Sequence, residues 1–489
     1  MMMKHKESII KFAKALAFCI LLVCIIDVTS GIFEKKSSMR KNGAFFNENE
    51  NMDVLILGDS HARDSIFPME LWNDYGITSY NFSGGHSTIA LNYWILKNVI
   101  SYSEPELVVL DCTMLSYNDK KVASLGLMHE QIDEIPLSAN KMNMLYDLLD
   151  NWDDRLQFIW KFSLYHSRWS ELTESDFKSR ELIADKLNRG STHQIKVAIP
   201  DTYPKLDKND TLEEDTFGIE YLRKTIEECQ KRNIDILLVY LPFPASEEKQ
   251  REANTVYDIA AEYNVDYINF LDLDVVNYNT DCHDVNSHLN VCGGRKVTSF
   301  LGNYITKNYK ITDHREDIAY IDWNNNYDNY KAYKISELKE LQNLDSYLMM
   351  LSDKNLNACI YIDESVIALM DERMIELIAN ISQYESLEQL ETAVASGKSY
   401  FLIVDNGLTD IVESVNGEFL DISNTSFGHL VFGTDEKGVP YLYIGDGEDN
   451  YLDGEYNVTA VAIDKYTGII EDVALFTMYD KVHYATRAE

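Results

Sequence analysis

The stretch "DVLILGDSHARDS", residues 53–65, decides the fold class of this chain. It begins with a run of Val, Leu and Ile, as a strand covered on both faces does, and the run stops at Gly58. Asp59, Ser60 and His61 then follow at the point where a helix would begin. The stretch therefore predicts a buried strand, a tight turn and a helix, with a serine presented at the turn.

Short apolar runs alternate with helical segments from here onward, which is the pattern of an α/β protein. Three further runs are typical of buried parallel strands, and the helices are predicted between them: strands 106–111, 234–242 and 265–270, and helices 88–103, 218–232 and 247–263. We therefore expect a parallel sheet flanked by helices in three layers. A polar, helix-leaning insertion at 119–215 interrupts the alternation and is a candidate cap over the site.

The length of 489 residues exceeds what one hydrophobic core usually supports, so we expect two folded domains. The sheet domain is predicted over 50–312, and a linker rich in Asn, Asp and Tyr over 313–337. A second, smaller domain of mixed α and β structure is predicted over 338–489. Within it, 456–476 is typical of a hairpin that turns at a Thr-Gly pair.

The N-terminus combines four lysines before residue 15 with an unbroken apolar run from Ala15 to Ile26. This pattern indicates export, and residues 1–36 are interpreted as a signal-anchor that crosses the cell membrane once. The alternative is a signal peptide cleaved near 28–30, which would release a secreted chain. Under both interpretations the folded domains lie outside the cytoplasm.

The chain carries 80 acidic and 44 basic side chains, which gives a formal net charge of -36. So negative a surface repels a polyanion, so the composition excludes nucleic acid as a partner. The 31 tyrosines supply amphipathic surface of the kind that contacts sugars. Seven cysteines without a CxxC pair form no disulfide framework, and Cys282 with Cys292 is the local pair that the spacing suggests.

A serine on a tight turn at the carboxyl end of a first parallel strand lies where open sheets bind ligands. If a helix starts there, the backbone N–H of Ser60 faces an oxyanion formed on an attacked carbonyl. Gly84 and Gly85 follow the second strand and are candidates for the second donor, because glycine allows close approach. The competing interpretation is that Asp59 or Ser60 merely caps the helix and that the glycines form a plain turn.

The segment "DCHDVNSHLN", residues 281–290, supplies a base for this nucleophile. His288 follows the last strand of the sheet and precedes a helix, so we expect it at the same carboxyl edge as Ser60. Asp284 is close enough in sequence to orient the imidazole and to stabilise its charged form. The sequence thus predicts a catalytic triad of Ser60, His288 and Asp284.

A zinc site is the alternative for this segment, because Asp281, His283, Asp284 and His288 are all potential ligands. Their spacing matches no standard zinc motif, and a metal would leave Ser60 unexplained. We therefore expect no metal and no other cofactor.

Four residues are candidate substrate contacts. Asp59 and His61 flank the nucleophile, while Arg168 and Trp169 lie in the insertion and suit a sugar or a phosphate. Ordinary packing is an equally good interpretation of Trp169.

The motifs resemble those of the SGNH/GDSL hydrolase superfamily from about Asp53 to Tyr309. "GDSH" matches the first block with Ser60 as nucleophile, "NFSGGHS" matches the glycine block, and "DVNSHLN" matches the terminal Asp-His block. The late "HLN" form is more like the membrane-associated branch typified by D-alanyl-transfer proteins of teichoic acid synthesis and alginate O-acetylation proteins.

The chain departs from the family pattern in two places. The usual "GxND" block should follow "ELVVL", but the chain reads "DCTMLSYND", in which Asn118 comes several residues late. The usual Asp lies three residues before His, whereas Asp284 lies four before His288.

The resemblance implies an SGNH-like sheet domain and a serine esterase or O-acyltransferase that works outside the membrane. Its expected substrate is a cell-surface polysaccharide carrying acyl groups, with acetyl as the expected group and a membrane acyl-donor protein as a further partner. The C-terminal domain resembles the sugar-associated domain of the interleukin-like EMT inducer family through "NVTAVAIDKYTGIIEDVALFT", which implies glycan or partner binding. The alternative function is a non-catalytic surface glycan-binding or assembly protein on a degenerate SGNH scaffold.

Overall fold

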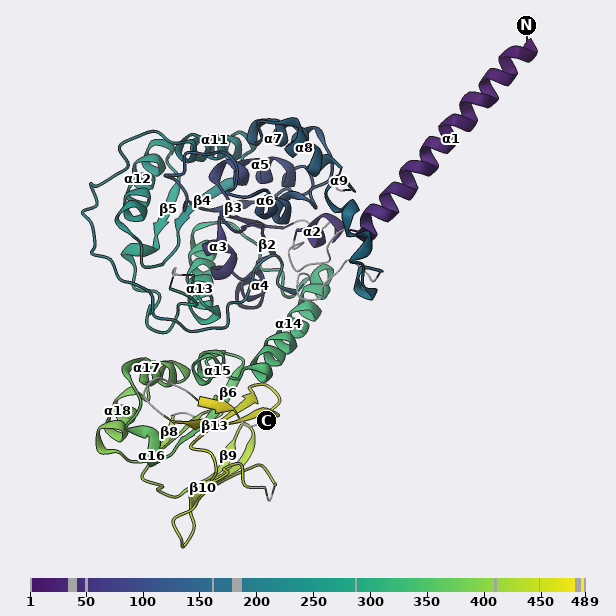
Figure 1. The fold of residues 1–489 in the computed structure, drawn as a ribbon. Helices are drawn as coiled ribbons and strands as arrows, with labels where there is room; N and C mark the ends of the chain where they lie inside the picture. The colour runs from purple at the N-terminus through teal and green to yellow at the C-terminus, as the bar shows by residue number, and fades with distance from the viewer. Residues whose placement is uncertain are drawn as a thin grey trace.

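The structure, a computed structural model, describes residues 2–33, 42–48, 52–160, 162–177, 187–285, 288–408, 411–447, 449–479 and 485–487. Helix α1 (Met2–Phe33) projects away from the folded units (Figure 1). Its stretch Ile9–Phe33 is long and apolar enough to cross a membrane, a property that a signal sequence shares. The short helix α2 (Gly43–Glu48) follows.

Five parallel strands form the central sheet, in the order β2-β1-β3-β4-β5. Their bounds are β1 (Val54–Leu57), β2 (Ser79–Asn81), β3 (Leu107–Asp111), β4 (Asp235–Tyr240) and β5 (Asp266–Asn269). In the parallel register Leu55 lies opposite Val108, and Val109 lies opposite Leu237. The predicted α/β class with a parallel sheet is confirmed.

Alternate residues of the strands face two separate cores. Leu55 and Leu57 pack among side chains of α5, α11 and α12, whereas Val54 and Ile56 pack among side chains of α3, α4 and α13. These helices are α3 (Ser60–Ser65), α4 (Pro68–Tyr75), α5 (Ile89–Val99), α11 (Phe217–Arg232), α12 (Glu247–Tyr263) and α13 (Val291–Asn308). Because both faces are covered, the strands are apolar on both sides, which is why their sequences read as continuous apolar runs.

The insertion is helical in its first part and irregular in its second. Its helices are α6 (Leu125–Ile132), α7 (Ala139–Leu148), α8 (Trp152–Ile159), α9 (Phe162–Tyr165), η1 (His166–Ser170) and η2 (Glu174–Phe177). Helix α7 contacts α5, and α9 with η1 contacts α1, so the helical part lies at the side of the sheet near the base of α1 (Figure 1).

The irregular part, residues 187–212, runs along the carboxyl edge of the sheet, and we call it the strap. Its backbone is held at four points: the Asn81 N–H donates to the carbonyl of Arg189, the Thr192 N–H to that of Arg63, the Ala198 N–H to that of Cys282, and the Val291 N–H to that of Gln194. Both parts of the insertion therefore reach the predicted site: the strap runs along the edge, and Gln131 of α6 donates from Nε2 to the Gly85 carbonyl at 3.0 Å.

The stretch expected to be a linker contains a packed helix, α14 (Ile321–Glu340). Trp323, Tyr327 and Tyr330 recur at helical spacing and are buried, and Trp323 contacts Trp72 of α4 with 5.2 Å between ring centroids. Polar residues outnumber these aromatics, so the composition concealed the buried stripe. Two short 3₁₀ helices, η3 (Phe270–Asp272) and η4 (Ile318–Tyr320), precede it.

A six-stranded sheet in the order β14-β13-β12-β6-β7-β8 forms the centre of the second unit. Its pairings are antiparallel, and β12 with β13 makes the predicted hairpin. Helices pack on one face and a three-stranded sheet on the other. The bounds are β6 (Leu356–Ile362), β7 (Tyr400–Val404), β8 (Val412–Val415), β12 (Val458–Asp464), β13 (Ile470–Met478) and β14 (Ala485–Arg487); α15 (Leu344–Leu351), α16 (Glu364–Ile367), α17 (Glu372–Ile381) and α18 (Leu387–Ser396); and β9 (Leu420–Thr425), β10 (Gly428–Thr434) and β11 (Pro440–Ile444).

Charged side chains join the two units, and we call Glu70, Arg295, Lys334, Asp353 and Lys354 the charge cluster, of which Glu70, Lys334 and Asp353 are buried. Lys334 Nζ lies 2.7 Å from Glu70 Oε1 and 2.8 Å from Asp353 Oδ2. Arg295 also binds Asp353, at 2.5 Å, and Lys354 binds Glu70, at 2.8 Å. Burial alone would raise the pKa of both carboxyls, but the cations lower it, to about 2 for Glu70.

The charge cluster predicts a pH-dependent stability. Because folding lowers the pKa of Glu70 and Asp353, their ion pairs stabilise the protein fully above about pH 4.5, and this stabilisation is lost as the pH falls toward about 2. Lys334→Met leaves two carboxylates buried with fewer cations, and we expect it to cost about 3–5 kcal/mol of unfolding free energy at pH 7. The cost should shrink toward pH 3, where the carboxyls of the variant become protonated.

Urea unfolding followed by tryptophan fluorescence at both pH values measures this difference. Lys331→Met is the matched control, because Lys331 lies on the same helix and pairs with the exposed Asp328. Equal losses for Lys334→Met at pH 7 and pH 3 would show that packing, not charge, is responsible.

Candidate active site

A tight turn joins β1 to α3 at Gly58. A Cβ at this position would lie 2.6 Å from the Cβ of Asp111 and 2.8 Å from the Cβ of Ala62, so glycine alone lets α3 begin against the end of β3. Asp59 caps the helix, since its Oδ1 accepts a hydrogen bond from the His61 N–H at 2.8 Å. The cap is therefore Asp59, and the hydroxyl of Ser60 is left for another partner.

Ser60, His288 and Asp284 meet in series at this turn. Ser60 Oγ lies 2.8 Å from His288 Nε2, and His288 Nδ1 lies 2.9 Å from Asp284 Oδ2. With its proton on Nδ1 held by the carboxylate, the imidazole leaves Nε2 to accept from the hydroxyl. Burial alone would raise the pKa of Asp284, but the hydrogen bond from His288 lowers it, which keeps this carboxylate ionised at neutral pH.

A closed loop holds His288 and Asp284 together. The His283 N–H donates to the His288 carbonyl at 2.7 Å, and Cys282 pairs with Leu289 in an antiparallel bridge. Asp284 Oδ1 also accepts from the His288 backbone N–H at 3.2 Å. These bonds fold the segment back on itself, which is how a spacing of four residues brings the carboxylate to the imidazole.

The backbone donors near Ser60 are not equivalent. Within the described residues the Ser60 N–H donates no hydrogen bond, as an oxyanion donor requires. The Gly84 N–H donates to the Gly58 carbonyl at 3.3 Å and is therefore occupied. The Gly85 N–H makes no bond to another described residue, so of the two glycines Gly85 has the donor available.

His61 packs against the imidazole of His288. Its ring stacks on that of His288 with 4.9 Å between centroids and also contacts Phe243 at 4.3 Å. Its Nδ1 lies 3.0 Å from Asp59 Oδ1. Burial alone would lower the pKa of His61, but the Asp59 carboxylate raises it. Asp59 is itself buried, so its contacts are with His61 and the helix terminus rather than with solvent.

Asp111, at the end of β3, is a buried carboxyl that the sequence analysis did not single out. Its Oδ1 accepts from the Thr113 hydroxyl at 2.8 Å, while Oδ2 has no hydrogen-bond partner. Burial, followed by the charge of Asp59, raises the pKa of Asp111 to about 7. The sequence feature that could have indicated this residue is that Asp111 is the one acidic residue of β3 and stands at its end.

Arg168 and Trp169 lie apart from the triad, on η1, which contacts α1. Arg168 donates to the carbonyl of Phe33 at the end of α1 and binds Asp176 at 3.0 Å. Trp169 is 71% exposed. The structure thus places both side chains at the junction with α1 rather than beside Ser60.

Three of the four residues weighed as zinc ligands, Asp281, Asp284 and His288, have other partners, while the buried Nδ1 of His283 has no hydrogen-bond partner among the described residues. Asp281 faces Lys296 Nζ at 2.8 Å, away from the imidazole of His288, which binds Asp284. Over the described ranges no group of three or more His, Cys, Asp and Glu side chains is arranged to hold a metal. Cys282 and Cys292 are both buried free thiols.

The contact at Gly58 predicts a loss of stability on substitution. Gly58→Ala places a methyl group within 3 Å of two Cβ atoms, and such overpacking typically costs about 1–3 kcal/mol. Gly454→Ala is the control, because no atom lies within 4 Å of its Cβ position. Urea unfolding midpoints measure both; equal midpoints would mean that the turn has room for a side chain.

Asp111 predicts a pH dependence of stability opposite in sign to that of the charge cluster, because its pKa is raised and not lowered. Because folding raises its pKa, the wild type loses stability as the pH rises from about 4 to about 7. Asp111→Asn keeps the acceptor for Thr113 and removes this loss, so the variant should gain on the wild type by on the order of 2–4 kcal/mol between pH 4 and pH 8. Unfolding free energies at both pH values test this. Asp258→Asn, on the exposed face of α12, should show no such trend, and a pH-independent difference for Asp111→Asn would contradict the prediction.

The chain was compared with protein families and with curated proteins. No family model matches the chain, and a search of curated proteins finds no significant relative. The distinctive feature of the structure is a hydroxyl, an imidazole and a carboxylate in series at the carboxyl edge of a parallel sheet.

Proposed function

We propose that this protein is an extracytoplasmic serine esterase or O-acyltransferase of the SGNH type. It would add or remove acyl groups, with acetyl as the expected group, on a cell-surface polysaccharide. The observation that carries the proposal is the pair of distances Ser60 Oγ to His288 Nε2, 2.8 Å, and His288 Nδ1 to Asp284 Oδ2, 2.9 Å. A nucleophile, a base within hydrogen-bond reach and a group that orients the base are the parts that acyl transfer needs.

The first half of the mechanism forms an acyl-enzyme. His288 Nε2 takes the hydroxyl proton as Ser60 Oγ attacks the ester carbonyl carbon. The resulting oxyanion faces the N–H groups of Ser60 and Gly85. The C–O bond to the sugar then breaks, the departing sugar oxygen takes the proton from Nε2, and the acyl group stays on Ser60 while Asp284 remains ionised.

The second half decides between hydrolysis and transfer. Water or a sugar hydroxyl attacks the acyl carbon and gives its proton to His288, and Ser60 Oγ leaves and recovers that proton. Water yields a free acid, whereas a sugar hydroxyl yields a new ester. Transfer also requires an acyl donor, for which a membrane protein is the proposed partner.

The N-terminal helix supports a location at the outer surface of the cell membrane. Its apolar stretch Ile9–Phe33 would anchor the protein, and a cleaved signal peptide is the alternative that leaves the site equally extracytoplasmic. A surface polysaccharide is within reach of either form.

A non-catalytic glycan-binding or assembly role is the second candidate. The observation that favours it is the end of β3, which continues into Cys112 and Thr113 and offers no side-chain amide for an oxyanion. Asn118 lines a separate groove with Thr216 and Lys224. In this alternative the second unit binds the glycan and the sheet serves as a scaffold.

Covalent labelling distinguishes the two candidates. Brief exposure of the full-length protein in detergent to a serine-directed fluorophosphonate should add one adduct to the wild type and none to Ser60→Ala, as measured by intact-mass spectrometry. Asp284→Asn should slow labelling by about 10³–10⁴-fold, because the imidazole loses the group that fixes its tautomer. Ser101→Ala, at an exposed serine at the end of α5, should label like the wild type.

Two results would count against the enzyme. An adduct that persists in Ser60→Ala would exclude Ser60 as the nucleophile. Absence of any adduct in the wild type, together with glycan binding that survives Ser60→Ala, would select the binding protein.

A further inference from the structure

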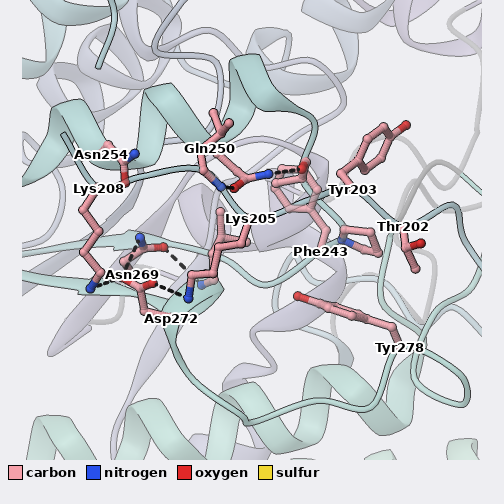
Figure 2. A pocket seen from close by; sticks show the side chains of 14 residues that line it. Thr202, Tyr203, Lys205, Lys208, Phe243, Gln250, Asn254, Asn269, Asp272 and Tyr278 are labelled. Atoms are coloured by element: carbon pink, nitrogen blue, oxygen red, sulfur yellow. Dashed lines mark hydrogen bonds and ion pairs between the residues drawn. The ribbon is translucent and has the colours of Figure 1, made fainter. Parts of the chain in front are cut away.

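A pocket of about 250 Å³ lies at the carboxyl edge of the sheet, between the strap and the ends of β4 and β5 (Figure 2). The strap, the loop after β4, helix α12 and the segment after β5 all contribute side chains to it. The lining residues that matter here are Lys205, Lys208, Phe243, Gln250, Asp272 and Tyr278.

The pocket adjoins the candidate active site through Phe243. This ring lines the pocket and also contacts the ring of His61 at 4.3 Å, and His61 in turn stacks on His288 at 4.9 Å. Two ring contacts thus separate the pocket from the imidazole that faces Ser60. A molecule in the pocket would therefore be separated from the imidazole of His288 by the rings of Phe243 and His61.

The strap side of the pocket is fixed before any ligand arrives. Gln250 Oε1 accepts from the Leu206 N–H at 2.8 Å, and its Nε2 donates to the Pro204 carbonyl at 2.9 Å. Asn254 Nδ2 donates to the carbonyls of Asp207 and Asp210 at 3.0 and 2.9 Å. Side chains of α12 already hold the strap backbone. Ligand binding would therefore not lose conformational entropy by ordering the strap.

One end of the pocket is positively charged. Lys205 and Lys208 converge on the carboxylate of Asp272, at 2.9 and 2.8 Å (Figure 2). Two ammonium groups on one carboxylate leave a net positive charge, in a chain whose formal charge is -36. The carboxylate of Asp207 keeps its own negative charge, but it accepts from Asn209 on the strap, and in the described residues neither lysine pairs with it.

The two lysines retain donors for a ligand. Their side chains are 66% and 62% exposed, whereas Asp272 is 15% exposed. Each ammonium group carries three N–H donors, of which Asp272 takes one. Asp272 also accepts from the Tyr257 hydroxyl at 3.1 Å, so a further acceptor for the remaining ammonium protons has to come from outside.

The other end of the pocket is aromatic. The rings of Phe243 and Tyr278 line it together (Figure 2). The C–H face of a sugar ring is apolar and packs on aromatic rings. The polar substituents of the sugar bind the polar side chains around it.

We propose that this pocket binds one sugar unit that carries a negatively charged substituent, with the ring against Phe243 and Tyr278 and the charge toward Lys205 and Lys208. The inference rests on the proposed function and narrows its substrate to an acidic polysaccharide, of which a neighbouring unit would present its ester to Ser60. A single ring suits the volume, which is just below the ~300 Å³ at which ligand pockets usually begin. The anion is a carboxylate or a phosphate.

Saturation-transfer NMR titrations of the full-length protein in detergent test the pocket. Glucuronate and glucose 6-phosphate represent the two anions, and glucose is the neutral reference. We expect at least one anionic sugar to bind about five- to tenfold more tightly than glucose. The double variant Lys205→Gln/Lys208→Gln should remove this preference, and Lys205→Arg/Lys208→Arg should keep it. Lys437→Gln, an exposed lysine on the second unit, should change nothing.

The outcomes separate this inference from the proposed enzyme. A preference for glucuronate supports a carboxylate ligand, and a preference for glucose 6-phosphate supports a phosphate ligand. Equal binding of all three sugars, or an anion preference that survives the double glutamine variant, overturns the inference. Ser60→Ala should bind the sugars like the wild type, and the double variant should keep the wild-type fluorophosphonate labelling rate, so each claim can fail alone.

Discussion

The contact between Gly58 and Asp111 determines the candidate active site. Because no side chain separates them, α3 begins directly against the end of β3, and Ser60 is presented at the carboxyl edge, just beyond β1, the second of the five strands. The same contact buries Asp59 and Asp111 close to each other. His61 offsets this repulsion through its bond to Asp59, so the turn, the cap and the stacked imidazoles form one unit.

The position of His288 follows from helix packing rather than from the loop alone. Ser60 and His288 are 228 positions apart in sequence, and α13, which starts three residues after His288, packs against α3. A Cβ at Gly294 would lie 2.6 Å from the Phe67 ring, so this glycine allows the close approach of α13. The strap passes the same edge, which is why a pocket and the triad adjoin each other.

The fold class was predictable, and so was the meeting of Ser60, His288 and Asp284 at one edge of the sheet. Buried parallel strands leave apolar runs, and the carboxyl ends of such strands meet at one edge whatever the loops contain. The strap was not predictable, since its bonds to Asn81 and Cys282 join backbone groups and leave no side-chain pattern.

The surroundings of other residues depend on partners that are remote in sequence. Arg168 was expected at a substrate, but its partner is the carbonyl of Phe33, at the end of α1. The burial of Asp111 exists only once α3 covers β3. For α14, three aromatic residues at helical spacing outweigh a polar composition because Trp72 lies where Trp323 can reach it.

The charge cluster also sets where this protein can be divided for expression or recombination. A fragment that ends after α13 would keep Glu70 and Arg295 but lose Lys334, Asp353 and Lys354. The boundary that composition suggests, near residue 313, therefore divides the charge cluster between two fragments. A sheet unit made alone would expose Glu70 and Arg295 without their partners. The two units are better treated as one module, exchanged or truncated together.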